Sequence, residues 1–168
     1  MPKPFAVAAI VVILAAAAAP PIATAQNPQA PTPPAAAPQA YRPGLGDLMT
    51  MTVQPRHIKI ALAGREKNWA YAKYELHELE EALQRVVQVW PRWRGLPLGG
   101  MVEAIGKGPM AAVAAAIEAK DADKFNAAMP QLTEGCNACH QAANVGLVVI
   151  KMPDASSFPD QDFRPSGR

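Results

Sequence analysis

Apolar residues between positions 44 and 149 recur at helical spacing, and no stretch alternates convincingly as a half-buried strand would. The clearest pattern runs from Asn68 to Trp90, where apolar residues lie alternately three and four positions apart. This pattern predicts a helix with one face packed against partner helices, capped by Asn68 at its start and ended by Pro91. The apolar face consists of Trp69, Ala72, Leu76, Leu79, Leu83, Val86 and Trp90.

Two further predicted helices contain residues that interrupt helices. One covers 46–63, is expected to stop at Gly64, and either starts or kinks at Pro55. The other covers 101–120 and is expected to break near Pro109, which leaves a firm helix from that proline onward. Both have apolar residues at helical spacing, so both are expected to pack against partner helices.

A fourth helix is predicted after Asp121 or Asp123, either of which is suited to cap it. Pro130 is expected to bend this helix. One stripe of the helix carries Phe125, Ala128, Leu132, Cys136, Cys139 and Ala143. Four helices with short connections predict an all-α protein, arranged as an antiparallel four-helix bundle.

The chain begins with the features of a secretory signal peptide. Lys3 precedes the apolar run 5–19, and the small-residue triplet 23–25 is of the kind that signal peptidase accepts. The run is shorter than the roughly 20 residues that a bilayer span needs, and an uncleaved membrane anchor is the alternative. We therefore predict a signal peptide over 1–25 and a periplasmic protein, which contacts the membrane only if the signal is not removed.

Composition divides the remainder of the chain. Proline, alanine and glutamine dominate 26–44, so this stretch is predicted to be an extended linker that buries no core. The folded domain is predicted over 45–145 and is followed by a tail, 146–168. This tail either lies back over the folded domain or has no fixed structure. The net charge of +2 gives no reason to expect a nucleic-acid partner.

The two cysteines of the chain lie in the sequence Cys136-Asn137-Ala138-Cys139-His140, which matches the C-x-x-C-H attachment motif for haem c. Residues three apart lie on one face of a helix, so both thiols can bond to the two vinyl groups on one edge of a porphyrin. The adjacent histidine then binds the iron as the proximal ligand. The motif predicts one covalently attached haem c.

Other uses of these cysteines are less consistent with the chain. A structural zinc ion needs four ligands, and besides carboxylates only His57 and His77 remain, at spacings unlike those of zinc modules. A thioredoxin-type cysteine pair follows a strand in a βαβ unit, and no such unit is visible. A disulfide between the two cysteines would be strained.

A C-x-x-C-H motif on the last of four helices resembles the class II c-type cytochromes, the cytochrome c′ family, in their low-spin form. The resemblance covers about 46–143 and rests on the helix plan, the segment 125–140 and the motif itself. It implies a four-helix bundle that packs the haem among its helices, and dimers through the first two helices. The segment 64–69 and the long tail are not typical of that family. Class I cytochromes are less similar, because only 141–168 follow the motif here.

The resemblance implies that the first helix covers the second face of the iron. Low-spin class II cytochromes place an axial methionine there, which makes Met49 a candidate distal ligand and Met51 a weaker one. His57 is the other candidate, since it lies two helical turns from Met49. Arg56 and Lys59 are placed to neutralise the haem propionates. His77 is expected at the surface.

The distal ligand determines which function is expected. With methionine or histidine on the iron, the haem is low-spin and suited to electron transfer with redox partner proteins. With no distal ligand, the alternative is a five-coordinate protein that binds or senses NO or CO. No arrangement of nucleophile and base suggests an enzyme.

Overall fold

The computed structural model describes residues 41–167. The signal peptide predicted over 1–25 lies outside the described residues, as does the predicted linker up to residue 40. Within 41–167 the chain is mainly helical, so the predicted all-α class is confirmed. The elements, with η for a π-helical turn, are α1 (Leu45–Leu48), η1 (Met49–Val53), α2 (Gln54–Arg65), α3 (Trp69–Val89), β1 (Arg92–Trp93), β2 (Leu96–Pro97), α4 (Leu98–Ile105), η2 (Gly106–Met110), α5 (Ala111–Glu118) and α6 (Ala122–Ala142).

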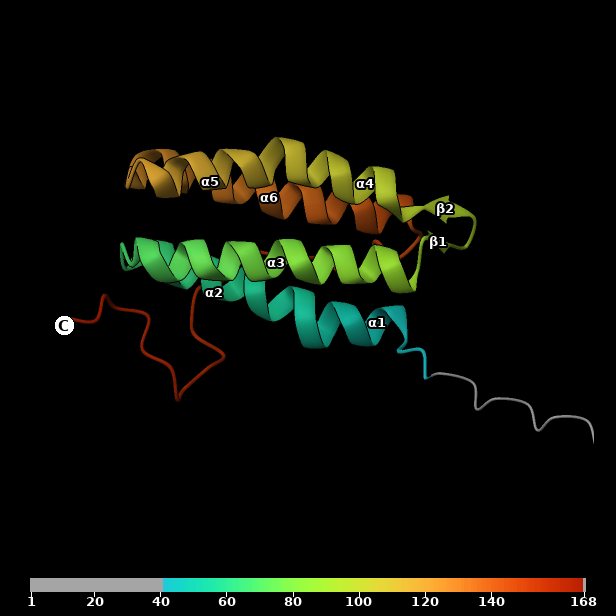
Figure 1. Cartoon of the computed structure of the whole chain (residues 1–168), viewed down its shortest axis with the longest axis horizontal. Helices are drawn as coiled ribbons and strands as arrows, with labels where there is room; N and C mark the ends of the chain where they lie inside the picture. The colour runs from blue at the N-terminus through green and yellow to red at the C-terminus, as the bar shows by residue number, and fades with distance from the viewer. Residues whose placement is uncertain (1–40, 168) are drawn as a thin grey trace, which may run out of the picture. The chain divides into compact units, whose positions relative to one another are not determined.

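Several of these elements are parts of longer helices. α1, η1 and α2 follow one another without a gap, and so do α4, η2 and α5. These two long helices lie side by side with α3 and α6, and the chain reverses direction at each connection (Figure 1). α2 packs against α3 and α6, and α5 packs against α3 and α6. The core therefore lies between the helices, where their apolar faces meet.

The predicted apolar face of α3 forms much of this core. The helix starts after Asn68, whose Oδ1 accepts a hydrogen bond from the backbone N–H of Tyr71 at 3.2 Å, so the predicted cap is confirmed. It ends at Val89, shortly before Pro91. The buried residues of its apolar face are Ala72, Leu76, Leu79, Leu83 and Val86.

Two prolines that disfavour α-helix lie in or next to π turns. Pro109 lies inside η2, and Pro55 is the second residue of α2, which follows η1. A π turn adds one residue to the turn and displaces the carbonyl that a proline ring would otherwise meet. The predicted break at Pro109 is therefore wrong, and Leu98–Glu118 is one continuous helix. By length and composition alone this helix is apolar enough to cross a membrane, as core helices of soluble proteins also can be.

The sequence led us to expect no strands, and this prediction is wrong for the connection between α3 and α4. A two-stranded hairpin pairs Arg92 with Pro97 and Trp93 with Leu96. Its turn places Arg94 and Gly95 at positive φ, 48° and 87°. Positive φ at both central residues is the geometry of tight hairpin turns, for which glycine at the second position is well suited. The strands are too short to show an alternating pattern in the sequence.

Three helices end in the same way, on a residue in the left-handed conformation. Lys67, Lys120 and Asn144 have φ values of 56°, 51° and 55° after α2, α5 and α6. At each end, two backbone N–H groups fold back onto carbonyls of the last helical turn. This is the Schellman motif, in which glycine is the usual left-handed residue.

Gly64 does not end α2 as predicted, because the helix continues to Arg65. The residue is instead a point of close contact, where a Cβ atom would lie 2.1 Å from ring carbons of Phe125 on α6. The same phenylalanine meets Trp69 edge to face, with 5.8 Å between ring centroids. The absence of a side chain at Gly64 thus lets α2 and α6 approach each other at this end.

Candidate functional site

The site of interest lies at the C-terminal end of α6. This helix begins at Asp121, whose Oδ1 accepts a hydrogen bond from the backbone N–H of Lys124 at 3.0 Å, so the cap predicted at Asp121 is confirmed. The predicted stripe then passes from buried apolar residues, among them Phe125 and Leu132, to the half-buried Cys136 and Cys139. The stripe therefore ends in two thiols that share one face of the helix.

These thiols open onto an apolar cavity of about 270 Å³. Its walls come from the start of the first long helix, from α3, α4 and α6, and from the segment that follows α6. Apart from the weaker candidate Met51, the residues predicted to attach the haem or to bind its iron line this cavity, namely Met49, His57, Cys136, Cys139 and His140. Ligand cavities are typically about 300 to 1,000 Å³ and mainly apolar, so this one is apolar as expected and slightly smaller than that range.

Both cysteines are free thiols. Burial raises the pKa of Cys136 to about 11, with a smaller contribution from the neighbouring Cys139. Burial also raises the pKa of Cys139. Redox-active cysteine pairs have lowered pKa values, because the thiolate is the reactive form. The environment of this pair therefore differs from that of a thioredoxin-type site.

A single hydrogen bond determines the tautomer of His140. Its Nδ1 lies 2.7 Å from the backbone carbonyl oxygen of Val148. A carbonyl oxygen only accepts, so Nδ1 carries the proton and the neutral ring keeps a lone pair on Nε2. Metal-binding histidines in proteins are held in this way, with the second ring nitrogen donating to a carbonyl or carboxylate.

The carbonyl of Val148 belongs to a segment that lies along the end of α6. We call residues 145–150 the strap. The Schellman motif at Asn144 turns the chain back after α6, with the N–H of Val145 donating to the carbonyl of His140 at 2.9 Å. Farther along, the Asn137 amide both accepts from the N–H of Ile150, at 2.8 Å, and donates to its carbonyl, at 2.9 Å. The strap thereby forms one wall of the cavity.

The two candidate distal ligands differ in their partners. His57 is buried, and its Nε2 lies 2.9 Å from Oγ1 of Thr133. That hydroxyl donates to the carbonyl of Met129 at 3.1 Å, so His57 is the donor in the bond to Thr133. Burial lowers the pKa of His57, which favours its neutral form. His57 therefore bridges α2 and α6 through its Nε2.

Met49 lies on η1, is half-buried and lines the cavity. Met51, two residues later, is 76 % exposed and does not line it. The same π turn thus directs one methionine toward the cavity and the other into solvent. Residues two apart on a helix lie on different faces, which accounts for this difference.

The residues expected to neutralise propionates have other partners. Arg56 pairs with Glu75 at 3.0 Å and with Glu78 at 3.2 Å, and Lys59 lies 3.7 Å from Glu75. Glu75 is buried, so these cations compensate its charge between α2 and α3. Neither cation lines the cavity. His77 is exposed and pairs with Glu81 at 3.3 Å, in agreement with the expectation of a surface position.

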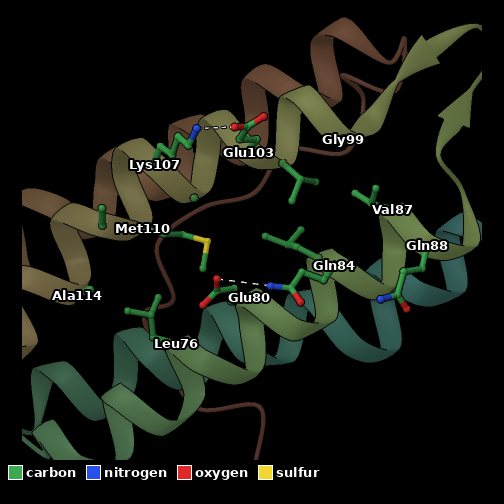
Figure 2. A pocket seen from close by; sticks show the side chains of 14 residues that line it. Leu76, Glu80, Gln84, Val87, Gln88, Gly99, Glu103, Lys107, Met110 and Ala114 are labelled. Atoms are coloured by element: carbon green, nitrogen blue, oxygen red, sulfur yellow. Dashed lines mark hydrogen bonds and ion pairs between the residues drawn. The ribbon is translucent and has the colours of Figure 1, made fainter.

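A second hollow, of about 660 Å³, lies between α3 and the long helix of α4, η2 and α5 (Figure 2). Its rim is polar, with Gln84 bonded to Glu80 at 3.5 Å on one side and Lys107 paired with Glu103 at 2.5 Å on the other. Neither cysteine and no histidine lines it. Although it is the larger of the two, its lining lacks thiols and imidazoles, so the smaller cavity is the candidate site.

Within residues 41–167 no group of three or more His, Cys, Asp and Glu side chains is arranged to hold a metal ion. A scan against protein-family models and searches of curated proteins and of solved structures found no match to this chain. The resemblance to class II cytochromes therefore stays a prediction.

Sequence reasoning missed Asn137, Thr133 and Val148, since their contacts join distant parts of the chain. Only the turn-forming Asn144-Val145-Gly146 indicates a chain reversal after α6.

Proposed function

We propose that this chain is a mono-haem c-type cytochrome that acts in electron transfer. In this proposal Cys136 and Cys139 hold the haem by thioether bonds and His140 binds the iron on the proximal side. The observation that carries the proposal is the meeting of the two thiols and the free Nε2 lone pair of His140 at one apolar cavity. The bound haem would supply an iron that alternates between the ferric and ferrous states.

The thiols have the protonation state that thioether formation starts from. Each S–H adds across one vinyl C=C bond, with the sulfur bonded to one carbon and the hydrogen to the other. Both cysteines are free thiols, as this addition requires. Their shared face on α6 directs both sulfurs to the same side of the cavity, as attachment along one porphyrin edge requires.

The class II form of the proposal includes the antiparallel four-helix bundle. The side-by-side helices and the reversal of the chain at each connection support this arrangement (Figure 1). The first helix lines the cavity with Met49, as a helix that covers the distal face would. The proposal also includes export to the periplasm, redox partner proteins and a homodimer, each of which rests on the sequence analysis.

We propose Met49 rather than His57 as the distal ligand. His57 already uses Nε2 in a buried hydrogen bond to Thr133, and loss of such a bond leaves a buried polar group unpaired. Among residues 41–167, the sulfur of Met49 has no hydrogen-bonded partner to give up. A methionine ligand would make the haem low-spin and suited to outer-sphere electron transfer, without an open site for gas molecules.

The attachment is tested by exporting the full chain in a host that attaches haem c and by measuring covalent haem in the purified protein with the pyridine haemochrome assay. We expect one haem per chain, and none in the double variant Cys136→Ser with Cys139→Ser. A wild-type protein without covalent haem, produced beside a control cytochrome that is loaded, would contradict the proposal.

The two methionines of η1 provide a matched test of the distal ligand. We expect Met49→Ala to convert a low-spin spectrum to a high-spin one and to allow the reduced haem to bind carbon monoxide. Met51→Ala, in the exposed position, should leave both properties unchanged. A reduced wild-type protein that binds carbon monoxide at once would favour the five-coordinate alternative, and loss of the low-spin spectrum only in His57→Ala would assign the ligand to His57.

A further inference from the structure

The strap is attached to α6 through a residue of the attachment motif itself. Asn137 lies between the two cysteines but does not line the cavity. Its side-chain amide forms two hydrogen bonds with the backbone of Ile150, as a neighbouring strand would. Because this side chain bonds to both the N–H and the carbonyl of Ile150, it determines where Ile150 lies along α6 as well as how far Ile150 lies from the helix.

The same strap carries the carbonyl that binds His140. Val148 lies two residues before Ile150, and its carbonyl oxygen is 2.7 Å from Nδ1 of the histidine. The strap is therefore held at both ends, by the Schellman motif at Asn144 on one side and by the hydrogen bonds of Ile150 on the other. Asn137 and His140 are one helical turn apart on α6, so a single turn of helix presents both the residue that fastens the strap and the residue that the strap contacts.

We propose that Asn137 is a positioning residue, which orients the proximal ligand His140 by fastening the strap at Ile150. This inference rests on the proposed haem attachment and adds to it a residue that touches neither haem nor iron. The bond from Nδ1 to the Val148 carbonyl increases electron density at Nε2, and a more basic ligand stabilises ferric iron. Loosening the strap weakens this bond and raises the midpoint potential.

The test is a series of variants in the haem-loaded full chain. Asn137→Ala removes both bonds to Ile150. Asn137→Asp keeps an oxygen that accepts from the Ile150 N–H but loses the donor to its carbonyl. The matched control Asn126→Ala makes the same change at an exposed position of α6. A second control, Arg65→Ala, loosens the tail beyond the strap, where Arg65 binds the carbonyls of Pro153 and Asp154.

Two measurements report on the strap and on the ligand separately. The hydrogen-exchange rate of the Ile150 amide reports how firmly the strap is held. We expect this rate to increase by about tenfold or more in Asn137→Ala, because both anchoring bonds are lost. The midpoint potential reports the ligand and is expected to rise in Asn137→Ala and to rise less in Asn137→Asp. Both controls should keep the wild-type exchange rate and potential.

The outcomes distinguish this inference from the proposed function. If wild-type protein carries no covalent haem, the proposed function fails. If wild type and variants carry haem and Asn137→Ala leaves the potential unchanged, the positioning role of Asn137 is wrong while the cytochrome proposal stands. A rise in potential that Arg65→Ala reproduces in full would also overturn the role, since it would show a general effect of the tail.

Discussion

The same helices are packed closely at one end and stand around a cavity at the other. At the end where α2 leads into α3 and α5 leads into α6, the backbone of Gly64 touches the ring of Phe125. At the opposite end, next to the hairpin, the helices line the cavity of about 270 Å³ with Met49, His57 and the two thiols. One end thus contributes close contacts, whereas the other leaves room for a ligand.

The difference indicates a division between stability and function. Where side chains are closely packed, adding or removing atoms sharply lowers the free energy of unfolding, because protein interiors have almost no free space. The wall of a cavity accepts added atoms more easily, but the same atoms then compete with the ligand. The two ends should therefore respond in opposite ways to an enlarged side chain.

The largest expected effect is at Gly64. Gly64→Ala adds a Cβ that would lie 2.1 Å from the Phe125 ring, so the helices must move apart. We expect a loss of about 3 kcal/mol in the free energy of unfolding, measured by urea denaturation. Gly100→Ala, where no atom lies within 4 Å of the added Cβ, is the control. Partial recovery in the double variant with Phe125→Leu is expected, and equal stabilities of Gly64→Ala and wild type would contradict the close contact.

The next effect concerns the polar bridge beside the cavity. Thr133→Val is nearly isosteric but removes the acceptor of the buried His57 Nε2–H. We expect a loss of about 1 to 3 kcal/mol in the free energy of unfolding, because a buried donor is left unpaired. The double variant with His57→Phe removes donor and acceptor together and should be less destabilised than the sum of the two single variants. Strictly additive effects would show that the two side chains do not interact.

The same bridge predicts a dependence of stability on pH. Burial lowers the pKa of His57 below the value of 6.5 that it has in the unfolded chain. The unfolded state therefore binds more protons in the pH range between 6.5 and the lower pKa of the folded state. The stabilising contribution is fully present above pH 6.5 and is lost as the pH falls from there through the folded-state pKa. We expect the difference in unfolding free energy between pH 7 and pH 5 to be smaller in His57→Gln than in wild type. An unchanged difference would contradict the burial of a neutral His57.

A smaller effect of opposite sign is expected at the cavity end. Ala143 lines the cavity, and Ala143→Leu adds apolar atoms to it. We expect the haem-free protein to gain up to about 1 kcal/mol in unfolding free energy, and haem attachment during export to decrease. Unfolding measurements on the haem-free chain and the haemochrome assay check the two parts. A loss of stability as large as that of Gly64→Ala would mean that the two ends are packed alike.

The smallest expected effect is at the helix ends. Lys67 and Lys120 adopt the left-handed conformation, which costs roughly 1 to 2 kcal/mol for residues with a Cβ. Replacement by glycine removes this cost but increases the entropy of the unfolded chain, so we expect a net gain of about 0.5 kcal/mol for each variant. Thermal unfolding of Lys67→Gly and Lys120→Gly measures it. Lys73→Gly, in the interior of α3, should instead be destabilised.

The elements that sequence reasoning predicted correctly depend on local interactions. The apolar face of α3 follows from intervals of three and four residues, and the caps at Asn68 and Asp121 follow from side chains that bond within one turn. The hairpin and the π turns escaped prediction because two-residue strands have no pattern and because Pro109 suggests a break where the helix adapts. Gly64 was predicted as a helix end, since a glycine at a close contact and a glycine at a terminus look alike in sequence.

The amino-acid sequence by itself determined the helical class and the identity of the Cys136-to-His140 motif, because spacing along a helix puts both thiols on one face. Only the tertiary structure decided that Met49 and not Met51 lines the cavity, that His57 binds Thr133, and that the strap holds His140 in a single tautomer. These choices depend on contacts between residues distant in the chain, and such contacts follow from how the helices pack. Helix packing is set by the summed shape of many side chains, which no short stretch of sequence contains.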